Sequence, residues 1–276
     1  MALSTSSYFS NSMVGVPQVG GDMDIYETHT SPKFPIGQKY EREDGCVFRY
    51  VEFTSAVSSN ALCGTNLTQV GTVWGAANTA LAPSSTYQDP SETPGVYPGS
   101  LGSRYLISGI TGTINQYAGA YLTIVKGTGK PGVYRIRGND ATSNTKTGAI
   151  KITLFDKLQA AVDTSTSMMI TGCRWNGLAQ TTTASATLVP VGATVTSASA
   201  SSWGWIQSKG PCAVISEGVL TAGCLVTVGG LEGTIGQWQT GTTNTTTAYA
   251  GVFPIVGFCV GVGSATAVNL VNLQLD

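Results

Sequence analysis

Short apolar stretches recur along most of this chain, and polar joints rich in glycine separate them. Many stretches alternate apolar and polar residues or are rich in β-branched residues, as half-buried strands are. Their close spacing is typical of a sandwich or barrel, because alternating βαβ units need a helix-length segment between strands. We therefore predict an all-β protein made of β-barrel or sandwich modules, with an extended N-terminal arm and at most one or two short helices.

The clearest local signal is a β-hairpin in the first part of the chain. Residues 39–43 and 46–53 are strand candidates, and Asp44-Gly45 lies between them. Asp-Gly suits the two positive-φ positions of a type I′ turn, whose twist matches that of the flanking strands. We expect the two strands to pair across this two-residue turn.

A second group of strand candidates fills the middle of the chain, with glycine-containing joints between them. Residues 155–162 are the best helical candidate, and a short helix is also expected near residues 58–62. The expected strands are residues 105–108, 121–125, 133–137, 150–154 and 167–170.

These elements divide the chain into four parts. Residues 1–33 form the arm, and residues 34–103 form a first β segment that ends in a loop rich in Pro, Ser and Gly. Residues 104–172 form a middle β module. Residues 173–276 form a C-terminal β module that can complete the domain begun at residue 34, in which case the middle module is an insertion.

The first 33 residues contain isolated apolar residues among Ser, Asn, Gly and Asp, with no single period. Such a segment cannot form its own core, so it is either a disordered tail or an extended arm that lies on another surface. We favour the arm, because apolar residues serve no purpose in a solvated tail. Its apolar residues include Tyr8, Phe9, Met13, Val14, Val16 and Tyr26, and Phe34 follows directly.

Charge is scarce, above all toward the C-terminus. Charged residues make up 11% of the chain, against about 25% in an ordinary soluble domain. Only Lys209, Glu217 and Glu232 are charged between Arg174 and Asp276. The net charge of −1, without a basic run that interleaves aromatic residues, argues against a nucleic acid or an acidic membrane as partner. This composition favours surfaces that other protein covers.

Membrane and export signals are weak. Residues 248–268 are uncharged, but Pro254 and several glycines favour buried strands over the apolar helix of about 20 residues that a bilayer requires. Residues 1–9 lack the basic and apolar segments of a signal peptide, so we expect a protein kept in the cytoplasm until assembly or lysis.

The six cysteines include no CxxC pair; we interpret them as small buried hydrophobes, with disulfides as the alternative.

No pattern carries a strong catalytic signal. The Gly-Thr-Gly-Lys stretch at residues 127–130 lacks both the upstream Gly and the following Ser or Thr of a phosphate-binding loop. The single histidine, His29, lies in the arm and is expected to be exposed or at an interface. Asp22, Asp24 and Glu27 lack the spacing of a calcium loop, and the other acidic residues fall mostly in expected turns. We expect no enzymatic activity, no cofactor and no metal.

Aromatic and apolar residues in the C-terminal part are expected in a core or a subunit interface. Trp203 and Trp205 point to the same face if their segment is a strand. Their apolar company favours packing over stacking on sugars. The same role is expected for Ile255, Val256 and Phe258, which belong to a later apolar run.

The amino-acid sequence of the chain resembles that of the decoration, or cement, proteins of tailed-phage heads. The resemblance covers residues 34–53 and about 121–275. The stretches that carry it are residues 202–215, which include Trp-Ile-Gln-Ser-Lys-Gly-Pro, and residues 118–139, 153–163, 218–227, 255–261 and 268–273.

This resemblance implies a structural virion protein on the outer surface of a phage capsid. Such proteins bind the shell of major capsid protein after expansion, usually as trimers at threefold or quasi-threefold positions, and resist the internal DNA pressure. We expect the apolar arm residues and Phe34 to contact the shell or a neighbouring copy. The chain is longer than the smallest proteins of this kind, so the middle module is expected to be an extra domain.

Two other functions share a β-rich composition with much Gly and Thr. A tail-fibre or receptor-binding protein should show longitudinal repeats or coiled-coil heptads, and neither is found. A carbohydrate-active enzyme or lectin needs an acid pair or an exposed aromatic cleft, for which Trp203 and Trp238 are the residues to test. A phage tail or glycan-binding virion component is therefore the alternative function.

Overall fold

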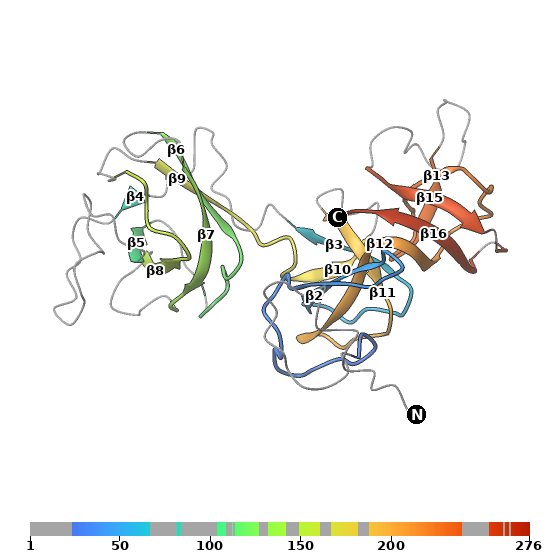
Figure 1. The fold of residues 1–276 in the computed structure, drawn as a ribbon, viewed down its shortest axis with the longest axis horizontal. Helices are drawn as coiled ribbons and strands as arrows, with labels where there is room; N and C mark the ends of the chain where they lie inside the picture. The colour runs from blue at the N-terminus through green and yellow to red at the C-terminus, as the bar shows by residue number, and fades with distance from the viewer. Residues whose placement is uncertain are drawn as a thin grey trace. The chain divides into compact units, whose positions relative to one another are not determined.

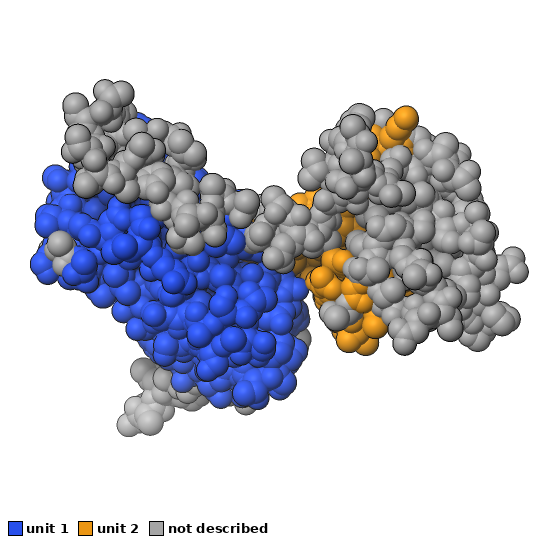
Figure 2. Space-filling view, turned by 180° about the vertical axis from the view of Figure 1, so that it is seen from behind, with its two compact units in different colours: residues 1–65, 175–276 blue, residues 66–174 orange. Residues whose placement is uncertain are grey.

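The computed structural model describes residues 24–66, 82–83, 104–108, 112, 114–126, 132–141, 149–160, 167–181, 188–238, 254–261, 263–264 and 266–276. These residues form strands and loops and no helix, which confirms the all-β prediction (Figure 1). Accordingly, none of them belongs to a helix that could cross a membrane. The chain divides into two compact units, coloured separately in Figure 2. Unit 1 comprises residues 1–65 and 175–276, and unit 2 comprises residues 66–174.

Unit 1 contains a ten-stranded sheet of which five strands close into a barrel. Closure is possible because β12 pairs with β11 on one side and with β2 on the other. The barrel interior holds Val51, Phe53, Leu178 and Ile206 among others. Its strands are, in order, β2 (Val47–Phe53), β10 (Leu178–Gln180), β3 (Leu62–Asn66), β11 (Leu188–Thr194) and β12 (Ser202–Ile215), and β1 (Lys39–Glu41) pairs with β2.

The long strand β12 joins the barrel to a second group of strands. Its first half pairs with β2, a register shift follows Gln207, and its second half, from Lys209 to Ile215, pairs with β16. We call this second half of β12 together with the next four strands the outer sheet. Those strands are, in order, β16 (Val268–Gln274), β15 (Ile255–Gly261), β13 (Leu225–Val228) and β14 (Ile235–Gln237). One face of the outer sheet packs on a core that includes Val214, Val226, Val256 and Val271.

Unit 2 contains a six-stranded antiparallel sheet. The five strands predicted in the middle of the chain are confirmed, each within two residues of its expected ends. Residues 66–103, which the sequence places with the first β segment, belong to unit 2. The strand order is β4 (Ala82–Pro83), β5 (Arg104–Ser108), β8 (Ala149–Leu154), β7 (Gly132–Asn139), β6 (Tyr121–Lys126) and β9 (Ser167–Thr171).

Both expected helices are wrong in the part of the chain that the structure describes. At residues 155–160 the chain follows β7 instead, since the Phe155 N–H donates to the Arg135 carbonyl and the Gln159 N–H to the Tyr134 hydroxyl, both at 3.0 Å. Near residues 58–62, Asn60 has a positive φ of 58° and β3 begins at Leu62. Tertiary contacts outweigh the weak local preference for helix in both places.

The predicted hairpin pairing is confirmed, but its turn type is wrong. Lys39 lies opposite Arg49 as β1 pairs with β2. The Gly45 N–H donates to the Arg42 carbonyl and the Arg42 N–H to the Cys46 carbonyl, and Gly45 has a φ of 80° whereas Asp44 keeps a negative φ. This is a three-residue turn with a bulge, and the Asp44 carboxylate stabilises it by accepting from the Cys46 N–H at 2.9 Å.

The arm does not extend to residue 33, because residues 24–33 lie against the outer side of the barrel. His29 exchanges two backbone hydrogen bonds with Trp203, at 2.8 and 2.9 Å. Ile25 and His29 are only 7% and 6% exposed, so the expectation of an exposed or interfacial histidine is wrong. The apolar outer side of β2 and β12, with Tyr50 and Trp205, requires this cover.

Candidate interaction face

The second face of the outer sheet is open and apolar. Cross-strand register places Pro211, Asn272, Phe258 and Leu225 in one row across four strands, from β12 to β13. Residues opposite one another share a face, and alternate residues such as Cys212 and Val271 point to the core on the other side. We call the exposed side the outer face; its side chains are Pro211, Ala213, Leu225, Ile255, Phe258, Val260, Val268, Leu270 and Asn272.

The outer face leaves a large amount of apolar surface in water. Leu225, Ile255, Val260, Val268 and Leu270 are each between 41% and 46% exposed. Burying the remainder of one such side chain stabilises a complex by about 1 kcal/mol, since complete burial is worth about 1.5–3 kcal/mol. A partner that covers all five therefore gains about 5 kcal/mol before the costs of association.

The few charges of the C-terminal part lie away from the centre of the outer face. The Glu217 carboxylate accepts hydrogen bonds from the N–H groups of Gly230 and Leu231 in the β13–β14 turn. Glu232 lies in the same turn, and Lys209 lies where β12 leaves the barrel. The middle of the face thus offers no charged group that a partner would have to desolvate.

The described edges of the ten-stranded sheet are protected against strand addition. At one end, β1 is three residues long and carries an exposed Lys39–Glu41 ion pair. At the other end, β14 is equally short, and its Ile235 carbonyl accepts from the Glu217 N–H at 3.0 Å. Short, charged or covered edges are the usual protection against unwanted pairing.

The free side of β12 beyond the barrel is blocked as well. Pro211 has no N–H to offer there. The buried Gln207 amide donates to the carbonyls of Lys209 and Pro211, at 3.1 and 2.8 Å, so these acceptors are also occupied. In unit 1 the open surface is thus the outer face and not a described strand edge.

A cavity of about 320 Å³ adjoins the outer face at Pro211 and Ala213. Tyr26, which is 62% exposed, lines the same cavity. Arg42 and Asp44 lie at this cavity too, and their side chains form an exposed ion pair at 3.6 Å. The structure thus brings one residue of the expected arm, Tyr26, next to the apolar face.

The remaining predicted contact residues are dispersed. Phe34 packs within its own domain, with its ring 5.2 Å from that of Tyr50 and 5.4 Å from that of Trp205. Tyr8, Phe9, Met13, Val14 and Val16 lie outside the described residues.

The residues expected in a core or interface fall into both classes. Trp205 and Val256 are buried, Trp203 packs partly buried in the same cluster as Trp205, and Ile255 and Phe258 lie on the outer face. Strand alternation could have identified Leu225, Val268 and Leu270 as well, but the sequence does not reveal which of the two faces is covered.

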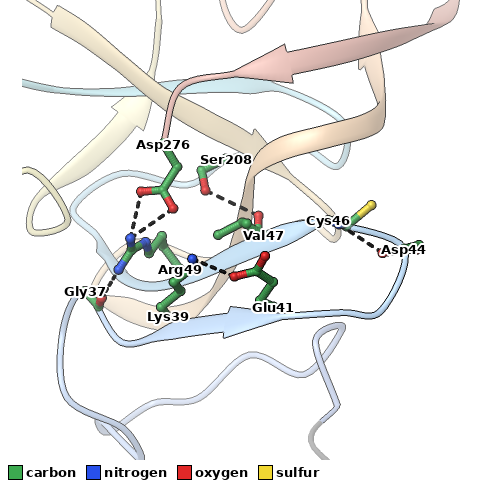
Figure 3. Close-up of polar contacts among 9 residues, drawn as sticks. All are labelled: Gly37, Lys39, Glu41, Asp44, Cys46, Val47, Arg49, Ser208 and Asp276. Carbon is green, nitrogen blue, oxygen red and sulfur yellow. Dashed lines mark hydrogen bonds and ion pairs between the residues drawn. The ribbon is translucent and has the colours of Figure 1, made fainter. Parts of the chain in front are cut away.

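An ion pair between Arg49 and Asp276, which we call the polar clip, joins the end of β16 to the barrel beside the outer face. In Figure 3, the Arg49 guanidinium points toward Asp276, and one of its nitrogens lies 2.7 and 2.9 Å from the two carboxylate oxygens. A second nitrogen donates to the Gly37 carbonyl at 3.0 Å, and the group lies 5.1 Å from the Trp175 ring centre. Through Arg49, Trp175 and Asp276, the clip joins three segments of unit 1: β2, the segment that follows unit 2 in the sequence, and the end of β16, the strand that bears Leu270.

The described residues contain no group of three or more His, Cys, Asp or Glu side chains that could hold a metal ion. Burial lowers the pKa of His29, which favours the neutral imidazole in the fold.

Scans against protein-family models, curated proteins and solved structures gave no match in any of the three comparisons. Functional inference therefore rests on the outer face and on the resemblance of the sequence stretches described above.

Proposed function

We propose that this chain is a structural virion protein that decorates and stabilises the outer surface of a phage capsid. It binds the shell of major capsid protein as an oligomer, a homotrimer by analogy with the proteins that it resembles. The observation that carries the proposal is the outer face, an exposed apolar sheet surface without a central charge. Such a surface suits a protein whose partners are other protein subunits.

The outer face is the surface that a partner covers in this proposal. Repeated copies on a symmetric shell need only modest affinity each, because multivalent contacts strengthen one another. Since the described strand edges of unit 1 are protected, contact through the sheet face is favoured over strand addition there. Tyr26 extends the contact surface at the adjoining cavity, and the apolar residues between Tyr8 and Val16 supply a second contact with the shell or a neighbouring copy.

The test measures the mass of the purified protein by multi-angle light scattering and its occupancy on capsids stripped of it by cryo-electron microscopy. Leu270→Lys places a charge in the middle of the outer face and should weaken oligomerisation or capsid binding at least tenfold, equivalent to about 1.4 kcal/mol. The matched control is Val189→Lys. Val189 is 40% exposed, close to the 43% of Leu270, but lies on β11 of the barrel.

A wild-type protein that stays monomeric and ignores stripped capsids would sink the proposal. Equal binding by both lysine variants would exclude the outer face as the contact surface. The arm is tested separately by deleting residues 2–23, which spares the buried Ile25 and His29. Unchanged capsid occupancy after that deletion would exclude a role for Tyr8, Phe9, Met13, Val14 and Val16.

A further inference from the structure

Two cysteines of the outer sheet lie directly opposite one another on neighbouring strands. Leu225 pairs with Phe258, so Cys224, the residue before β13, meets Cys259, the next residue of β15. The Cys259 N–H donates to the Cys224 carbonyl at 2.9 Å, which fixes this register. Cys224 packs against the core cluster that includes Cys259, so the two side chains lie on the same face of the sheet.

A bulge at Gly223 sets the position of Cys224. The Cys224 N–H donates to the Thr221 carbonyl at 3.0 Å, and the Gly223 N–H donates to the Cys259 carbonyl at 2.8 Å. Gly223 has a φ of 80°, a conformation that glycine adopts without strain. The bulge therefore places two residues, Gly223 and Cys224, opposite Cys259, and the local chain is built around this pairing.

This geometry suits a disulfide bond. Directly opposed residues of antiparallel strands have Cα atoms about 4.5–5.5 Å apart, within the range of about 4.4–6.8 Å that disulfides require. We propose that Cys224 and Cys259 are a site of disulfide formation by exchange with small aliphatic disulfides. This proposal is independent of the capsid role, because it concerns only the chemistry of unit 1.

The two thiols differ in access, which assigns their roles. Cys224 is partly exposed, whereas Cys259 is buried in the core of the outer sheet. The Cys224 thiolate attacks the small disulfide, forms a mixed disulfide with one half of it and releases the other half as a thiolate. Cys259 then loses its proton and attacks the Cys224 sulfur, which closes the protein disulfide and releases the second half. Two protein thiols are oxidised and one small disulfide is reduced to two thiols.

Two of the other described cysteines lie opposite residues that are not cysteine. Cys63 lies opposite Gln180, and Cys212 opposite Val271. Cys46 and Cys212 line the same cavity, but the register places Cys46 beside Gly210 and not beside Cys212. A Cys46–Cys212 bond is therefore the rival outcome that the experiment must distinguish.

The probe is oxidised glutathione, added to the reduced full-length protein at pH 8 and quenched with N-ethylmaleimide in denaturant. We expect the number of free thiols to fall from the six of the sequence to four. Digestion after glutamate separates the candidates, because Glu217 and Glu232 place Cys224 in peptide 218–232 and Cys259 in peptide 233–276. These two peptides should remain linked until a reductant is added.

Single variants test the order of the two steps. Cys259→Ser should retain one glutathione on Cys224, because the attacking second thiol is missing, and Cys224→Ser should give no linked peptides. The matched control, Cys63→Ser, removes a buried thiol that has no cysteine opposite and should still form the link. Six remaining thiols in the oxidised wild-type protein, or a link between peptides 44–52 and 93–217, would overturn the proposal.

Discussion

Arg49 connects parts of unit 1 that are far apart in the sequence, and its replacement tests how much this clip stabilises the fold. The side chains of Arg49 and Asp276 are only 20% and 13% exposed. Exposed ion pairs contribute about 0–1 kcal/mol, whereas breaking a buried one costs about 3–5 kcal/mol. For a pair that is covered but not sealed, we expect a coupling free energy of about 2 kcal/mol.

The two single variants should not cost the same. Asp276→Asn removes only the ion pair and should lower the free energy of unfolding by about 1–2 kcal/mol. Arg49→Met also removes the hydrogen bond to the Gly37 carbonyl and the stacking on Trp175, worth about 1–2 and 0.5–1 kcal/mol. We therefore expect a total cost of about 3–4 kcal/mol for Arg49→Met.

Urea unfolding monitored by tryptophan fluorescence is the suitable assay. Four of the five tryptophans, Trp175, Trp203, Trp205 and Trp238, belong to unit 1, so the signal reports mainly on this unit. The double variant completes a thermodynamic cycle with the two single variants. Costs that add within about 0.5 kcal/mol would refute the reasoning, because they would mean that Arg49 and Asp276 do not interact.

Four further variants test other parts of unit 1. Burial raises the pKa of Glu52, so ionisation of this carboxyl group opposes folding as the pH rises above about 4.5. Glu52→Gln should therefore raise the urea midpoint at pH 7 but not at pH 4. An equal gain at both pH values would contradict the raised pKa of Glu52. Gln207→Leu leaves the carbonyls of Lys209 and Pro211 without their amide donor and should cost about 1–3 kcal/mol in urea unfolding, with increased aggregation in light scattering as the strand edge opens. Trp205→Ala should cost about 3–5 kcal/mol and Trp203→Ala clearly less, since only Trp205 is fully buried; the reverse order in thermal unfolding would show that the core is assigned incorrectly.

Local features of the sequence predicted the hairpin strands and the five middle strands. The five strands of the middle module and the β1–β2 hairpin follow from alternation and β-branched residues, which act over a few neighbouring positions. The same local signals misjudged the hairpin turn, where the Asp44 side chain stabilises a longer loop, and the stretch after β8, where bonds to β7 replace a helix. In these places, contacts with residues nearby in space but not in the local pattern decided the conformation.

The site was only partly predictable. Scarce charge favoured surfaces that other protein covers, and Ile255 and Phe258 were expected in a core or a subunit interface; the structure places both on the outer face. His29 was expected in the arm and Phe34 at a contact with the shell or a neighbouring copy, because nothing near them in the sequence offers a core. The barrel wall bearing Tyr50 and Trp205 supplies that core from distant segments.

The sequence by itself determined the class of fold, the positions of the hairpin strands and of the five middle strands, and the scarcity of charge in the C-terminal part, because each depends on residue types within a short window. Only the tertiary structure decided that β12 closes the barrel and then carries the outer sheet, that Arg49 meets Asp276 across 227 positions, and that Cys224 faces Cys259. These pairings depend on register between strands, which the sum of many packed side chains fixes and no local pattern encodes.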